Sequence, residues 1–97
     1  MLQMKDPAHP GELVGATLED MGVSISEAAR QLGVSRQLLH GIIAGRNPVS
    51  PNIAVRLEAG IGSTAETWLR MQMNYDLAQI RKRAAPADVK RIAPKVA

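Results

Sequence analysis

Apolar residues recur three and four positions apart along most of the chain, which is the period of a helix. Val14, Leu18 and Met21 show this spacing between a proline that suits the first turn of a helix and a glycine that can end one. No segment alternates apolar and polar residues for long, as a half-buried strand would. The pattern predicts an all-α protein with a first helix over residues 10–21.

Four further segments have recognisable helix starts and stops. Ser26 and Ser35 have side-chain oxygens that can cap a second and a third helix, and Ser50, followed by a proline, can open a fourth. The fifth helix has two candidate caps, because Ser63 with a glutamate three residues later could form a capping box and Thr64 is an equally good cap. These helices are expected over residues 26–32, 36–44, 51–60 and 65–83.

Packing expectations follow from the same pattern. The fourth helix is expected to bury Ile53, Leu57 and either Ala54 or Val55, and Trp68 of the fifth is expected in the core. A broad apolar arc remains on the fifth helix, and one small domain cannot easily cover it. We therefore expect a homodimer interface on that arc, formed by Met73, Leu77 and Ile80.

Length and composition narrow the class of protein. Ninety-seven residues allow one small domain, and we expect it over residues 1–83, followed by a basic, loosely ordered tail over 84–97 with a short turn within 87–92. The chain has no cysteine, which fits a reducing compartment and predicts a cytoplasmic protein. No apolar run approaches the roughly 20 residues of a membrane span.

The second and third helices have the form of a helix-turn-helix. Ala28 and Ala29 are small enough to let the two helices approach, and Gly33 permits a sharp turn. Val34 can place an apolar side chain beneath that turn, and Leu39 is one of the residues that hold the third helix against the others. The pair is thus a candidate DNA-binding unit.

The third helix has an unusual outward face. At 100° per residue its apolar residues fall on one side, and the other side carries Arg36, Gln37, His40, Gly41 and Ala44. A mid-helix glycine costs roughly 1 kcal/mol against alanine. We expect Gly41 to keep this face low, so that the major groove of DNA can approach it closely.

Each polar residue of this region has a role in such a complex. Arg36 could bond guanine O6 and N7, Gln37 could pair with adenine, and His40 could donate to a base or a phosphate. Ser35 at the helix start, and Arg46 and Asn47 just past its end, suit phosphate oxygens. The alternative is that these residues simply form a solvated helix face. Residues 28–57 contain no acidic residue that would repel phosphate, which favours DNA binding.

The chain resembles the HigA-type antitoxins, also called virulence-associated protein I, within the phage-repressor-like (XRE) helix-turn-helix class. Three pieces carry the resemblance: "HPGE" at residues 9–12, "LGVSRQLLHGIIAGRNPVSP" at residues 32–51, and the pattern from Trp68 to Leu77. It implies a five-helix lambda-repressor-like domain that binds a palindromic operator as a dimer, with Ser35, Arg36, Gln37 and His40 on the recognition helix and Arg46 on the following loop. It also implies a small basic toxin as partner, typically an mRNA endonuclease.

Other functions have less support in the sequence. His9 and His40, without cysteine, do not make a metal site, and His9 is expected to cap a helix or form a local hydrogen bond. No nucleophile motif or phosphate loop indicates an enzyme, and nothing indicates a cofactor.

A protein-binding surface is a further possibility. The acidic residues could face a basic partner, or simply aid solubility; they are Glu12, Glu19, Asp20, Glu58, Glu66 and Asp76. Two alternatives stay open: a phage-type repressor without a toxin, and a helical module that binds only protein.

Overall fold

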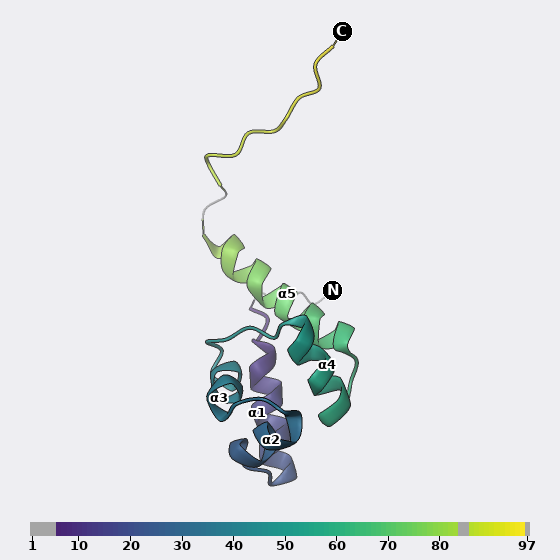
Figure 1. The fold of residues 1–97 in the computed structure, drawn as a ribbon. Coiled ribbons are helices and arrows are strands. Elements are labelled where there is room, and N and C mark those ends of the chain that lie inside the picture. Colours follow the sequence, from purple (N-terminus) through teal and green to yellow (C-terminus); the bar gives the residue numbers. More distant parts are fainter. Residues whose placement is uncertain (1–5, 84–85, 97) are drawn as a thin grey trace, which may run out of the picture.

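The computed structural model describes residues 6–83 and 86–96, and its described part contains five helices and no strand. The helices are α1 (Pro10–Met21), α2 (Ile25–Leu32), α3 (Arg36–Ile43), α4 (Pro51–Gly60) and α5 (Ala65–Lys82). The first four form a compact bundle in which α1 and α2 both pack on α3, and α4 packs along α5, the longest helix (Figure 1). The predicted all-α, five-helix fold is confirmed.

Most helix starts follow the serine and threonine signals. The hydroxyls of Ser35, Ser50 and Thr64 accept backbone N–H bonds three residues on, at 3.0, 3.3 and 3.0 Å. The prediction for α2 was wrong, because Ser24 is the cap and accepts from the Glu27 N–H at 3.1 Å. Two serines two residues apart both offer the right oxygen, and the structure uses the earlier one.

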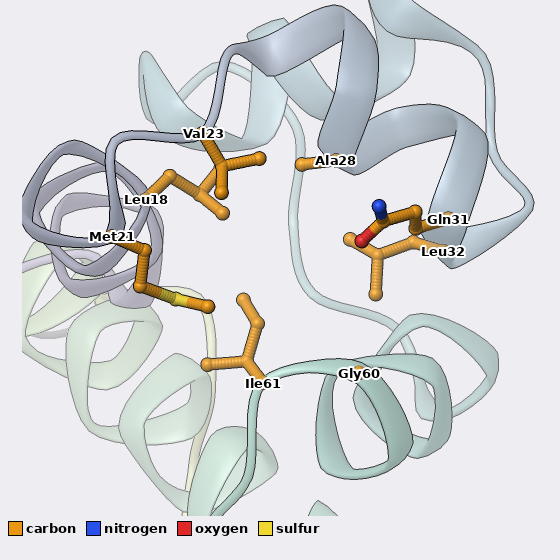
Figure 2. Close-up of a pocket in the computed structure, with 8 residues that line it drawn as sticks. All are labelled: Leu18, Met21, Val23, Ala28, Gln31, Leu32, Gly60 and Ile61. Atoms are coloured by element: carbon orange, nitrogen blue, oxygen red, sulfur yellow. The ribbon is translucent and has the colours of Figure 1, made fainter.

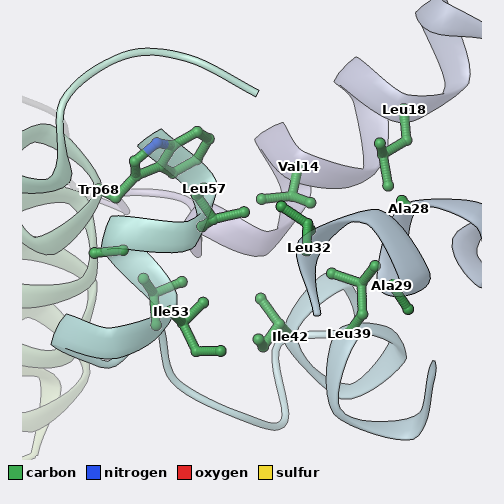
Figure 3. Close-up of a cluster of buried hydrophobic side chains, with 12 residues drawn as sticks. Val14, Leu18, Ala28, Ala29, Leu32, Leu39, Ile42, Ile53, Leu57 and Trp68 are labelled. Atoms are coloured by element: carbon green, nitrogen blue, oxygen red, sulfur yellow. The ribbon is translucent and has the colours of Figure 1, made fainter. Parts of the chain in front are cut away.

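The core lies where all five helices converge, and α2 contributes Ala28, Ala29 and Leu32 to it (Figure 3). Val14, Leu39, Ile42 and Leu57 are almost wholly buried, and Trp68 closes the cluster with its indole Nε1–H donating to the Gly62 carbonyl at 2.9 Å. The predicted core position of Trp68 is therefore confirmed.

The open choice in α4 is settled for Ala54, which is fully buried, whereas Val55 is 56% exposed. Met21 is 57% exposed, so the buried stripe of α1 ends one turn earlier, at Leu18. Met21 is the last residue of its helix, and its half-exposed side chain lines a small pocket at the edge of the bundle.

Beyond α5, residues 86–96 form no helix or strand and are exposed, and they lead away from the bundle (Figure 1). A single turn at residues 87–88 is closed by the Val89 N–H donating to the Pro86 carbonyl at 3.3 Å, which agrees with the predicted turn. The predicted division between domain and tail falls beside residues 84–85, which lie outside the described residues. In the described part, no helix has both the length and the apolar character needed to cross a bilayer.

Candidate nucleic-acid interface

The helix-turn-helix geometry puts the start of α3 on the surface. Gly33 has a φ of 75°, a left-handed conformation that suits glycine, and the chain turns there from α2 into the cap of α3. Arg36, Gln37 and His40 are all exposed along α3, and Arg46 is exposed in the loop that follows. The structure therefore brings the predicted base-reading residues to one exposed helix.

Arg36 is held by a second helix. Its Nε donates to the Ser26 hydroxyl at 3.1 Å, so α2 supports a side chain that belongs to α3. This bond uses Nε, and the two terminal nitrogens of the guanidinium remain available for the parallel bonds that guanine accepts. Ser26, wrongly predicted as a helix cap, thus has a different role.

His40 and Arg46 form a polar pair across the end of α3. An Arg46 terminal nitrogen lies 3.2 Å from His40 Nδ1. Because a guanidinium can only donate, Nδ1 is the acceptor and the ring proton sits on Nε2. The pair therefore offers an imidazole N–H and a full positive charge side by side at the surface.

The expected role of Gly41 was wrong. Gly41 is buried, and a Cβ built on it would collide with the amide nitrogen of Asn47. The missing side chain therefore makes room for Asn47, a residue of the same protein, and not for DNA. The Gly41 carbonyl also accepts the backbone N–H groups of Arg46 and Asn47, at 2.8 and 3.1 Å. Asn47 is half-buried in consequence, which makes it the least accessible of the six predicted DNA-binding residues.

Sequence reasoning gave His9 its helix-capping role correctly but missed its surroundings. The ring Nδ1 accepts the Gly11 N–H at 2.9 Å, and the side chain is 5% exposed. The Tyr75 ring of α5 meets it edge to face, with centroids 4.9 Å apart. Burial lowers the pKa of His9 below its ordinary value of 6.5, while the carboxylates of Asp76 and Glu12 act in the opposite direction.

Two other residues form long-range hydrogen bonds that were not predicted from the sequence. Arg56 of α4 donates to the Leu32 carbonyl at 3.0 Å, and so caps the end of α2. Gln72 of α5 is 6% exposed, and its carbonyl oxygen accepts the Val49 N–H at 2.7 Å. Both bonds join residues more than twenty positions apart, which local patterns do not encode.

A small apolar pocket lies away from these polar residues. It has a volume of about 50 Å³ and opens between the end of α1, α2 and the end of α4 (Figure 2). None of the six predicted DNA-binding residues lines it. Among residues 6–83 and 86–96, no three histidine or acidic side chains are grouped as metal ligands would be.

Comparison with known proteins places this geometry in a family. A helix-turn-helix family model matches residues 16–69, which include α2 and α3. Virulence-associated protein A' of Dichelobacter nodosus is 40% identical over 84 residues, covering 86% of this chain and 73% of its own length. Antitoxin HigA-1 of Vibrio cholerae is 35% identical over 78 residues, covering 79% of this chain and 73% of its own. The chain belongs to the HigA-type helix-turn-helix antitoxin family.

A solved structure of similar fold agrees with this assignment. PA4674 of Pseudomonas aeruginosa, solved in complex with its operator DNA, superposes with a TM-score of 0.78 at 26% identity, covering 89% of this chain and 97% of that one. The fold is therefore that of a HigA-type DNA-binding regulator, and the resemblance inferred from the sequence is confirmed.

Proposed function

We propose that this HigA-type protein is a transcriptional repressor that binds an operator at its own promoter as a homodimer, with α3 in the major groove. The observation that carries the proposal is the exposed set on α3, in which Arg36 is oriented by Ser26 and His40 is paired with Arg46. Four basic residues and one acid occur in residues 24–56, so phosphates are attracted to this half of the domain.

The roles within this interface differ. Arg36 and Gln37 read base edges, and Ser35, Arg46 and the imidazole of His40 contact phosphate or a base acceptor. Asn47 acts mainly through the backbone of its loop, because its side chain lies against Gly41.

The dimer is proposed to form through α5. Met73, Leu77 and Ile80 lie at positions i, i+4 and i+7, on one side of the helix, and are 52%, 39% and 58% exposed in the single chain. A two-fold pairing of this stripe would give the protein the symmetry of a palindromic operator.

We also propose that the protein neutralises a small basic toxin that cleaves mRNA, as the antitoxin of a type II pair. Support comes from the relative named antitoxin HigA-1. Of the acids that could meet a basic partner, Glu58 accepts the Ala65 N–H at 2.9 Å and Asp76 accepts the Gln72 amide at 2.9 Å. Since these two serve the fold, the partner contact is assigned to Glu12, Glu19, Asp20 and Glu66, which are exposed.

Binding to a duplex from the region upstream of its own gene tests the DNA proposal. Arg36→Ala should cost about 1 to 3 kcal/mol and relax the preference at one base position, whereas Arg46→Ala should weaken all sequences alike. Unchanged affinity in both variants would favour the alternative of a protein-binding module.

Co-purification with the product of the adjacent reading frame tests the antitoxin proposal. A basic protein of about a hundred residues that co-purifies supports it. An isolated gene, or a neighbour that does not bind, would leave the stand-alone phage-type repressor as the better description.

A further inference from the structure

The loop between α3 and α4, residues 44–50, carries Arg46 and is held at both ends. At its start, Gly45 has a φ of 79°, and the Gly41 carbonyl accepts the next two backbone N–H groups. Asn47 fills the space that Gly41 leaves. The backbone on both sides of Arg46 is thereby fixed to the end of α3.

The end of the loop is held from a different helix. Val49 is 2% exposed, and its backbone N–H donates to the side-chain oxygen of Gln72 in α5 at 2.7 Å. Without Gln72, this N–H would give up its hydrogen bond to water on folding and gain none in return. The Gln72 amide in turn donates to Asp76 at 2.9 Å, one turn further along α5. Because leaving that buried N–H without a partner is unfavourable, this contact strongly favours one position of the loop.

The start of α1 supports the same loop. The Cβ and Cγ of His9 lie 3.9 and 3.8 Å from where a Cβ on Gly45 would be, and the His9 ring also meets Tyr75. The loop is therefore contacted both by His9, at the start of α1, and by Gln72 of α5.

We propose that Gln72 is a positioning residue for DNA binding: by accepting the Val49 N–H, it holds the α3–α4 loop so that Arg46 stays beside His40 and meets the phosphate backbone. This inference rests on the proposed DNA-binding function. Gln72 itself is buried and need not touch DNA. Its effect reaches the nucleic acid through Arg46.

A double-mutant cycle separates positioning from general stabilisation. Gln72→Met keeps the length of the side chain and removes the acceptor, and Arg46→Ala removes the cation. Affinity for the promoter duplex and its dependence on salt are measured for both single variants and the double variant, at a temperature where each is folded by circular dichroism. If Gln72→Met is not folded, Gln72→Asn, one methylene too short to reach Val49, replaces it.

Positioning predicts that Gln72→Met weakens binding about tenfold and lowers the salt slope as much as Arg46→Ala does, by about one unit. In the Arg46→Ala background, Gln72→Met should then change affinity less than twofold, because the contact that it orients is already absent. Additive losses would overturn the proposal, since they would mean that Gln72 acts independently of Arg46. If Arg46→Ala alone left affinity unchanged, the failure would lie in the proposed DNA contact.

A rescue variant provides the matched control. Gln72→Glu with Asp76→Asn keeps the net charge and can re-form both bonds, with the glutamate accepting from Val49 and from the new asparagine amide. We expect the rescue variant to bind within about threefold of the unmodified protein, given the context dependence of such substitutions. Affinity as low as that of Gln72→Met would overturn the positioning role.

Discussion

The imidazole of His9 and the phenol ring of Tyr75 meet edge to face, with ring centroids 4.9 Å apart and planes at 78°. The two residues come from "HPGE" and from the Trp68–Leu77 pattern, two of the three pieces that carry the resemblance to the HigA-type antitoxins. In the structure these distant pieces form one cluster that joins α1 to α5. Two of the pieces that carry the resemblance therefore also help to hold this domain together.

Stability should depend on pH through His9. Its Nδ1 accepts the Gly11 N–H, so protonation at that nitrogen would break the cap of α1. Because burial lowers the pKa of His9 in the folded protein, the unfolded chain binds the proton more readily. The contribution of His9 to stability is thus complete above pH of about 6.5 and declines as the pH falls below that value.

Thermal unfolding between pH 8 and pH 5 checks this expectation. His9→Asn keeps a side-chain oxygen that can cap the helix and removes the titrating ring. The melting temperature of the unmodified protein should fall more over this range than that of His9→Asn, while His40 is common to both. Parallel curves for the two proteins would contradict the assignment.

Gly11→Ala should be strongly destabilising. A Cβ on Gly11 would overlap the backbone carbonyl of Ile42, so α1 and α3 would have to separate. We expect a loss of about 3 kcal/mol in chemical denaturation. Gly15→Ala, one turn along α1, is the control, because its Cβ would meet only the Ile43 methyl group at 2.9 Å and the helix gains propensity. A similar loss for both variants would argue against a special close approach at Gly11.

Gly41→Ala should destabilise the domain by about 1 to 2 kcal/mol, since the new methyl group displaces Asn47 from the surface of α3. Adding Asn47→Ala should restore part of this stability by removing the obstructing amide. If Gly41 instead served to admit DNA, Gly41→Ala would keep or raise stability and weaken only operator binding. Denaturation and DNA titration of Gly41→Ala and of the double variant, each compared with the unmodified protein, distinguish the two cases.

Ile80→Asp should weaken the proposed dimer. Val55→Asp is a matched control, because both residues are β-branched side chains on a helix and are 58% and 56% exposed. A two-fold interface contains each substitution twice, so the dimer dissociation constant should rise about 100-fold for Ile80→Asp and change little for Val55→Asp. Sedimentation equilibrium measures both constants. Equal constants would place the interface away from the α5 stripe.

The helices could be predicted because their signals are local. Proline at a first turn, a hydroxyl before a helix and glycine after one act within four residues, so α1 and α4 were predicted with their observed bounds. Where two local signals compete, sequence alone does not choose. Ser24 and Ser26 both precede α2, and the hydroxyl of Ser26 is instead bound by Arg36 from the next helix.

The exposed face of α3 was also predictable, because helical periodicity separates it from the buried side. The roles of Gly41 and Gln72 were not. Gly41 sits on the outward arc by angle but lies beneath Asn47, which the chain brings back over it after the helix ends. Gln72 meets a backbone N–H 23 residues away. Such contacts depend on the path that the loops take in the folded protein, and neither residue type nor spacing predicts that path.

The two sides of α5 have a joint consequence. Trp68 faces the core and Gln72 faces the α3–α4 loop. Met73 and Leu77 are exposed on the other side of the same 18-residue helix. If two copies pair along that outer side, α5 connects the domain that carries α3 rigidly to the symmetry axis of the dimer. The distance between operator half-sites is then a fixed dimension of the protein, and DNA that departs from it must bend or twist to fit.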